Sequence, residues 1–265
     1  MKRTEAFMTT KAILEQGPAR TEKGVTTRHL WIAGFEGRRV PALVLTPPEA
    51  SGPRPVIMLG HGAGGSKDEP QMLSIARWLV RREGWAVAII DGPVHGERRS
   101  GDATSVGQEA RQMLVQRETY DAMAADWRHT LDACGELPDV GDGNAAYLGF
   151  SMGTILGVPT VAAEPRLKCA VFAIGGIIGD KDNLLGRAAE QIERPVLMIN
   201  QTEDEIFSHE AAFRLYDSLP GPKRIFFYPG GHTGVPREAM DRTREFIRAH
   251  LASEGADEGA PSGAW

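Results

Sequence analysis

Short apolar runs alternate with helical patterns along most of the chain, and this alternation constrains the fold more than any other feature. After a hairpin-like pair of strands at 27–34 and 38–47, six short apolar runs have Gly, Asn, Asp or Ser at or next to their ends, at 54–62, 85–92, 144–151, 167–176, 194–201 and 223–231. Apolar residues recur at three- and four-residue spacing between them, over 69–84, 117–137, 154–165, 184–193, 208–220 and 237–251. Such alternation predicts right-handed crossovers and a mostly parallel, doubly wound α/β sheet of about eight strands, covered on both faces.

Length and composition fit one domain. The chain has 265 residues, of which 42% are hydrophobic and 25% charged, as in a globular protein with a sizeable core. We expect an N-terminal extension at 1–23, one α/β domain at 24–252 and a small, polar, Gly- and Pro-rich tail at 253–265. No internal repeat or low-complexity linker divides the chain.

Charge and hydropathy limit the classes of partner and the cellular location that we expect for this protein. The formal net charge is −5 and the basic residues are scattered, which disfavours nucleic acid. The N-terminus lacks the continuous apolar segment of a signal peptide, and no run approaches the ~20 apolar residues of a spanning helix. We therefore expect a cytoplasmic monomer or small homo-oligomer without membrane contact. Cys134 and Cys169 lack a paired spacing and are predicted to be small buried hydrophobes.

A serine between two glycines marks one predicted strand-to-helix junction, "GFSMG" at 149–153. In an open parallel sheet, reactive groups collect at the carboxyl ends of the strands. Gly149 and Gly153 would let the backbone pass a tight turn that pushes the hydroxyl of Ser151 out of the sheet. The pattern in this setting predicts a nucleophile; the alternative is a serine that caps the helix beside glycines that only pack.

A nucleophilic serine needs a base, and the base needs a carboxylate to orient it. His232 follows the last predicted strand in a Gly-flanked loop, at the same sheet edge as Ser151. Asp204 follows the preceding strand and completes the chain order Ser, Asp, His. The alternative is that this acidic cluster caps the next helix, which fits Glu203 and Glu205 but leaves that chain order unexplained. Four other histidines are expected at structural or surface positions: His29, His129, His209 and His250.

A glycine-rich turn, "GHGAGG" at 60–65, follows the first predicted parallel strand. A tetrahedral oxyanion needs two preorganised backbone donors near the serine, and we expect the N–H groups of Ala63 and Met152 to supply this oxyanion hole. The turn does not match a phosphate loop, because Lys67 follows Ser66 rather than a glycine. It does not match a dinucleotide fingerprint either.

With these motifs in order, residues 24–252 resemble the α/β-hydrolase superfamily, in its serine esterase and dienelactone-hydrolase-like branch. "DGPVHGERR" at 91–99 resembles an Asp-x-x-x-His-Gly loop of that branch, in which Asp91 and His95 are expected to organise the loop. Dienelactone hydrolases carry a cysteine nucleophile and haloalkane dehalogenases an aspartate. Ser151 departs from both patterns.

The resemblance implies a mechanism and a substrate class. Ser151 would take the acyl group, His232 would act as general base and then general acid, and Asp204 would hold the imidazole tautomer. No metal or organic cofactor is implied. We expect a serine carboxylesterase for small-molecule, short-chain acyl esters. The alternatives are a carbon-carbon bond hydrolase or thioesterase on the same triad, and a non-catalytic binding protein of the same fold.

The spacing of the motifs leaves little room for a lid. Residues 176–193 are too few for a cap domain between their flanking strands. The longer segment 96–120 is predicted to form a polar flap, with Met113, Leu114 and Met152 lining a modest apolar acyl pocket. We therefore expect a preference for acyl groups of about two to six carbons and no interfacial activation.

Overall fold

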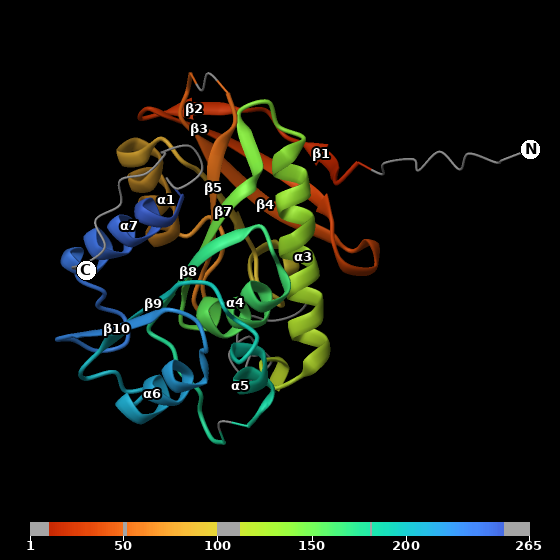
Figure 1. Cartoon of the computed structure of the whole chain (residues 1–265). Helices are drawn as coiled ribbons and strands as arrows, with labels where there is room; N and C mark the ends of the chain where they lie inside the picture. The colour runs from red at the N-terminus through yellow and green to blue at the C-terminus, as the bar shows by residue number, and fades with distance from the viewer. Residues whose placement is uncertain (1–10, 50–51, 100–111, 181, 252–265) are drawn as a thin grey trace, which may run out of the picture.

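The computed structural model describes residues 11–49, 52–99, 112–180 and 182–251 (Figure 1). Within these residues, ten strands form one sheet in the order β1-β3-β4-β6-β5-β7-β8-β9-β10, and β2 pairs with β3. The strands are β1 Ile13–Gln16, β2 Arg20–Glu22, β3 Val25–Ala33, β4 Arg39–Thr46, β5 Arg54–Gly60, β6 Ala86–Ile90, β7 Val140–Phe150, β8 Leu167–Ala173, β9 Val196–Gln201 and β10 Lys223–Tyr228.

The sheet is antiparallel at its N-terminal side and parallel elsewhere. The strands β1 to β4 pair antiparallel, as β4 does with β6, while every pair from β6 through β5 and on to β10 is parallel. This confirms the predicted α/β class with an antiparallel start. The 13–16 and 20–22 segments, which the sequence placed in an extension, instead pair with β3. They were missed because they are short and mostly exposed, without the alternation that marks a half-buried strand.

Helices cover both faces of the sheet (Figure 1). One face packs against α3, α4, α5 and α6, and the other against α1 and α7. The helices are α1 Pro70–Glu83, α3 Arg117–Gly135, α4 Met152–Ala163, α5 Leu184–Ala189, α6 His209–Ser218 and α7 Arg237–Leu251, with 3-10 turns at Phe35–Gly37 and Gly96–Arg98. Between β8 and β9 the described residues form only α5, so the chain has no cap domain there.

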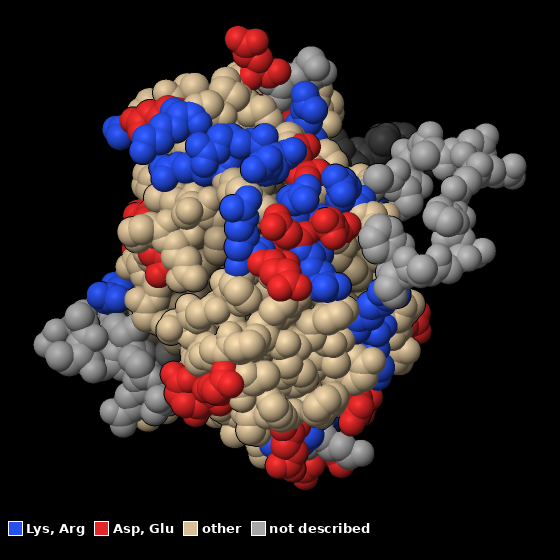
Figure 2. Space-filling model, turned by 90° about the vertical axis from the view of Figure 1, so that its left-hand side faces the viewer, with Lys and Arg blue, Asp and Glu red and all other residues tan. Residues whose placement is uncertain are grey.

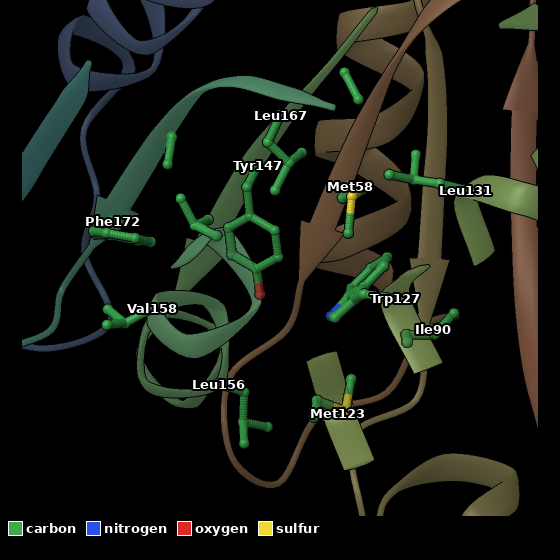
Figure 3. Close-up of a cluster of buried hydrophobic side chains, with 14 of the residues drawn as sticks. Met58, Ile90, Met123, Trp127, Leu131, Tyr147, Leu156, Val158, Leu167 and Phe172 are labelled. Atoms are coloured by element: carbon green, nitrogen blue, oxygen red, sulfur yellow. The ribbon is translucent and has the colours of Figure 1, made fainter. Parts of the chain in front are cut away.

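The central strands carry the apolar runs and are buried on both faces. Tyr147 of β7 lies between Trp127 and Phe172 in the core, with ring centroids 5.8 and 6.4 Å away (Figure 3). Burial of such aromatic side chains contributes much of the stability of a core. Cys134 and Cys169 are buried and free, and burial raises the pKa of each thiol to about 12. Both are thus inert core residues.

The face that carries α1 and α7 shows a band of Lys and Arg side chains with acidic side chains beside it (Figure 2). Part of this charge is paired within the molecule, since Arg244 of α7 forms an ion pair with Glu83 at the end of α1. None of the helices in the described ranges combines the length and apolar character needed to cross a bilayer. The cytoplasmic location stays a prediction.

Two expectations fall partly or wholly outside the described ranges. The tail at 253–265 lies outside them, and the predicted flap at 96–120 is described only at its two ends.

Candidate active site

Ser151 stands alone between β7 and α4 in a strained conformation, with φ 53° and ψ −112°. Its side chain makes no capping bond to α4, so the alternative of a helix-capping serine does not hold. A Cβ on Gly153 would lie 2.4 Å from the carbonyl oxygen of Gly60, and a Cβ on Gly149 would lie 2.4 Å from that of Gly153. Only glycine fits at both positions, and this close approach of β5, β7 and α4 forces the turn that presents Ser151.

The predicted serine, histidine and aspartate lie in one hydrogen-bonded chain. His232 Nε2 lies 2.8 Å from Ser151 Oγ, and His232 Nδ1 lies 2.9 and 3.0 Å from the two carboxylate oxygens of Asp204. A carboxylate only accepts, so Nδ1 carries the proton and Nε2 is left to accept from the serine hydroxyl. This is the tautomer in which an imidazole can act as a base toward the serine.

Sheet topology explains why residues 53 and 28 positions apart along the chain meet. Ser151, Asp204 and His232 follow β7, β9 and β10, whose carboxyl ends share one edge of the parallel sheet. Backbone N–H groups of Ile206 and Phe207 donate to Asp204 Oδ1 at 2.8 and 2.9 Å and fix its carboxylate. The carboxylate itself is fully buried.

Two buried histidines hold the glycine-rich turn after β5. His61 donates from Nδ1 to the carbonyl oxygen of Gly62 at 2.8 Å and accepts the N–H of Gly92 at Nε2, 2.9 Å away. His95 donates from Nδ1 to the oxygen of Pro93 at 2.6 Å and accepts the N–H of Gly64 at Nε2, 3.0 Å away. Burial lowers the pKa of His61 to about 4 and also lowers that of His95. Both rings are therefore neutral near pH 7 and act as fixed acceptors.

The two predicted oxyanion donors lie next to Ser151 in the fold. Met152 begins α4 directly after the serine, and a Cβ on Gly62, the neighbour of Ala63, would lie 3.8 Å from Ser151 Cβ. Because His95 occupies the N–H of Gly64, that donor is not available to a substrate. No acceptor within the described ranges takes the N–H of Ala63 or of Met152. Of these two unpaired donors, Ala63 lies in the turn after β5 and Met152 lies in the first turn of α4, where the helix dipole favours negative charge.

A buried ion cluster, which the sequence did not reveal, ties the loop after β6 to the same turn. Asp91 accepts from the backbone N–H of Lys67 at 2.8 Å, from Lys67 Nζ at 3.0 Å and from the N–H of Glu97 at 3.0 Å. Lys67 is 1% exposed and also reaches Glu97 at 2.6 Å. Burial alone would lower the pKa of Lys67, but its hydrogen bonds to Glu97 and Asp91 raise it. Asp91 and His95 thus both organise this loop, as the resemblance implied.

Gly96 is required beside this cluster. Its φ is 51°, and a Cβ there would lie 2.2 Å from a carboxylate oxygen of Asp91. The segment 91–99 thus needs His95 for its hydrogen bond to Gly64 and needs Gly96 because the carboxylate of Asp91 lies too close for a Cβ.

An apolar cavity of about 530 Å³ opens beside the site. Phe207, one of its lining residues, also packs on His232, with ring centroids 5.7 Å apart. Of the three residues predicted for a pocket, Leu114 lines this cavity, whereas Met113 and Met152 line a separate void of about 10 Å³. The sequence missed the other walls, which come from α4, from the segment around α5 and from the loop after β9: Ile155, Ile178, Leu184, Leu185 and Phe207.

The remaining histidines do not join the site. His209 opens α6 and packs on Phe227, with ring centroids 4.5 Å apart. His29 reaches Glu97 at 3.0 Å. In the part of the chain that the structure describes, no three His, Cys, Asp or Glu side chains form a group that could hold a metal ion.

Comparison with known proteins agrees with this geometry. The profile of the dienelactone hydrolase family matches residues 40–244, more than half of the chain. The chain is 24% identical over 234 residues to Esterase YjfP of Escherichia coli strain K12, covering 75% of this chain and 90% of that protein.

Solved structures are also similar. A cold-adapted esterase from an Arctic intertidal metagenomic library, in a PEG-bound complex, superposes with a TM-score of 0.77 at 29% identity, covering 89% of this chain and 98% of the other. The acetyl xylan esterase of Paenibacillus sp. R4 shares the fold, with a TM-score of 0.69 at 19% identity and coverage of 91% and 90%. The chain therefore belongs to the dienelactone hydrolase family of the α/β-hydrolase superfamily, and it is an enzyme that hydrolyses carboxylic esters.

Proposed function

We propose that the chain is a serine carboxylesterase for short-chain acyl esters, with Ser151, His232 and Asp204 as its catalytic residues. The observation that carries the proposal is the continuous chain of hydrogen bonds from Ser151 Oγ through the imidazole to a buried carboxylate. A Ser-His-Asp arrangement at the carboxyl edge of a sheet activates a hydroxyl that is otherwise a weak nucleophile.

The first half of the reaction forms an acyl-enzyme. Ser151 Oγ attacks the ester carbonyl carbon while His232 Nε2 takes the hydroxyl proton, and the negative charge moves to the carbonyl oxygen. The N–H groups of Ala63 and Met152 would hold this oxyanion. The tetrahedral intermediate collapses, the bond to the leaving oxygen breaks, and His232 gives the proton to the departing alcohol.

The second half releases the acid. A water molecule, with His232 again as general base, attacks the acyl carbon, and the bond to Ser151 Oγ breaks as the serine regains its proton. Asp204 keeps the proton of Nδ1 in place throughout and stabilises the imidazolium. No step needs a metal or an organic cofactor, so we expect chelators to leave the rate unchanged.

We infer the size of the substrate from the walls of the cavity and from the short connection between β8 and β9, where the described residues form only α5. The cavity is lined mainly by Leu, Ile and Phe side chains, with Asn183 and Arg187 as its polar lining residues. Two further lining residues, Val115 and Ile178, are 73% and 63% exposed. Such an apolar but open site suits a small acyl group of about two to six carbons better than a long chain that must be enclosed. Interfacial activation is not expected, because it needs a lid that opens.

Thioester and carbon-carbon bond hydrolysis are the alternatives, since the triad alone does not select the leaving group. We further propose that the catalytic groups all lie within residues 24–252 of a cytoplasmic monomer or small homo-oligomer. Gel filtration tests the oligomeric state.

One experiment tests the activity and the chain length together. We expect kcat/KM of the purified protein on nitrophenyl esters to be highest for acetate or butyrate and to fall for octanoate and palmitate, with Ser151→Ala inactive on all four. Matched thioesters and vinylogous diketones are run beside them. Faster turnover of either alternative class, or activity that survives in Ser151→Ala, would show that the proposal is wrong.

A further inference from the structure

Three consecutive acidic residues after β9 each contact a different group of the loop between β10 and α7, which carries His232 and is called the histidine loop below. Asp204 binds the imidazole ring of His232. The next residue, Glu205, accepts the backbone N–H of His232 at Oε2, 3.0 Å away. The preceding residue, Glu203, accepts the backbone N–H of Gly230 at Oε2. The ring and two backbone groups of one short loop are therefore held from a single segment.

The backbones of the two segments are also joined. The N–H of Thr202 donates to the oxygen of Tyr228 at 2.8 Å, and that of Glu203 donates to the oxygen of Gly230 at 3.0 Å. These bonds continue the pairing of β9 and β10 beyond its last register pair, Gln201 with Tyr228. The segments thus leave the sheet side by side.

Two glycines let the histidine loop turn its N–H groups toward the carboxylates. Gly230 has φ 136°, a conformation that L side chains rarely adopt. A Cβ on Gly231 would lie 3.1 Å from Oε2 of Glu205, closer than ordinary van der Waals contact. The "GGH" sequence therefore serves the close approach of Glu205 as well as the turn itself.

Neither glutamate caps the following helix, which was the alternative that the sequence left open for them. The cap of α6 is Ser208, whose Oγ accepts the N–H of Ala211 at 3.2 Å. The N–H of His232 holds the pKa of Glu205 below its ordinary value. Both glutamates are exposed, so neither is needed to fill the core.

We propose that Glu205, assisted by Glu203, is a positioning residue that holds the backbone of the His232 loop so that the imidazole bridges Asp204 and Ser151. The inference rests on the proposed function. A general base must stay within about 2.6–3.2 Å of the proton it takes, and misplacement by ~1 Å lowers a rate about a hundredfold. Charge-assisted bonds to the backbone on either side of the ring limit such displacement.

The test compares the loss of the acceptor with the loss of the charge. We expect Glu205→Ala to lower kcat for nitrophenyl butyrate roughly tenfold with KM unchanged, the effect of losing one charge-assisted hydrogen bond. Glu205→Gln keeps an oxygen that can accept the same N–H and should stay within about twofold of wild type. The matched control is Glu210→Ala, because the Glu210 side chain is 79% exposed and pairs with Arg214 rather than with the histidine loop. It should not change the rate.

A second readout does not depend on the natural substrate. A fluorophosphonate reacts when Ser151 Oγ bonds to phosphorus, fluoride leaves and His232 takes the hydroxyl proton, and the adduct is counted by intact mass. Labelling should slow roughly tenfold in Glu205→Ala, slow further when Glu203→Ala is added, and recover in Glu205→Gln.

The outcomes separate the two proposals. Equal labelling of Glu205→Ala and wild type overturns the positioning role alone, and so does a Glu205→Gln variant as slow as Glu205→Ala, since charge rather than backbone contact would then matter. A wild-type protein that neither hydrolyses esters nor takes the label at Ser151 overturns the proposed function instead.

Discussion

Acidification should destabilise this protein through His61, a buried ring that stays neutral in the fold. Burial lowers the pKa of His61 to about 4 from its ordinary 6.5. The unfolded chain therefore takes up a proton near pH 6.5, while the folded chain resists protonation until about pH 4. The contribution of the neutral His61 ring to the free energy of unfolding is therefore fully present above pH 6.5 and declines as the pH falls from 6.5 to about 4. One pKa unit corresponds to ~1.36 kcal/mol, so the total loss is about 3 kcal/mol.

His61→Gln isolates this contribution. The amide oxygen of glutamine can accept the N–H of Gly92, which His61 accepts at 2.9 Å, but it does not titrate. Carboxylates and the other histidines titrate in both proteins, so their effects largely cancel in the difference between the two unfolding free energies.

Urea unfolding followed by tryptophan fluorescence, at steps from pH 7.5 to pH 4.5, measures that difference. We expect the difference in unfolding free energy between the two proteins to be constant above about pH 7. At pH 4.5 the wild type should have lost between about 2 and 3 kcal/mol more stability than His61→Gln. A difference that stays flat over the whole range would refute the reasoning, because it would mean that His61 titrates alike in both states.

Three further changes test the site and its supports. Ser151→Ala, His232→Ala and Asp204→Asn should each lower kcat for nitrophenyl butyrate by ~10⁴- to 10⁶-fold, and combining them should lower it little further. His209→Ala should leave kcat unchanged. Gly153→Ala should lower the free energy of unfolding by about 1–3 kcal/mol or more, because its Cβ would lie 2.4 Å from the Gly60 oxygen. Gly143→Ala is the control, since no atom lies within 4 Å of its Cβ, and equal melting temperatures of the two variants would contradict the packing argument. Lys67→Met should lower the free energy of unfolding by about 3–5 kcal/mol, because it leaves the carboxylate of Asp91 buried without its cationic partner. A melting temperature equal to that of wild type would show that Asp91 does not need the charge of Lys67.

The central sheet was predictable because its information is local. Each parallel strand is an apolar run ended by a turn residue, and each crossover helix carries its own periodicity. The serine, aspartate and histidine were located for the same reason, since each follows a strand in the order that a parallel sheet brings to one edge. In the structure the three lie within hydrogen-bond reach. Their catalytic role stays a proposal.

Contacts that depend on the conformation of a loop could not be predicted in this way. Glu205 and Glu203 meet the histidine loop 27 residues away, and Lys67 meets Asp91 24 residues away. Each contact depends on how a loop leaves its strand, and no periodicity encodes that. The strands β1 and β2 were missed for another reason: they are only four and three residues long and mostly exposed, so they carry no apolar periodicity that a sequence pattern could reveal.

The strained serine and the aromatic core are parts of one arrangement. Tyr147 of β7 reaches under the first turn of α4, where its hydroxyl donates to the carbonyl oxygen of Gly153 at 2.7 Å (Figure 3). Its side chain fills the space that a Cβ on any of three glycines would need, with clashes at 2.5, 2.7 and 2.2 Å for Gly60, Gly149 and Gly157. Strain such as the positive φ of Ser151 persists only where the surroundings over-determine it. Tyr147 adds to the constraint that the close approach of β5, β7 and α4 imposes, because moving the elbow toward a relaxed conformation would break the hydrogen bond of Tyr147 and open a void beside Trp127 and Phe172.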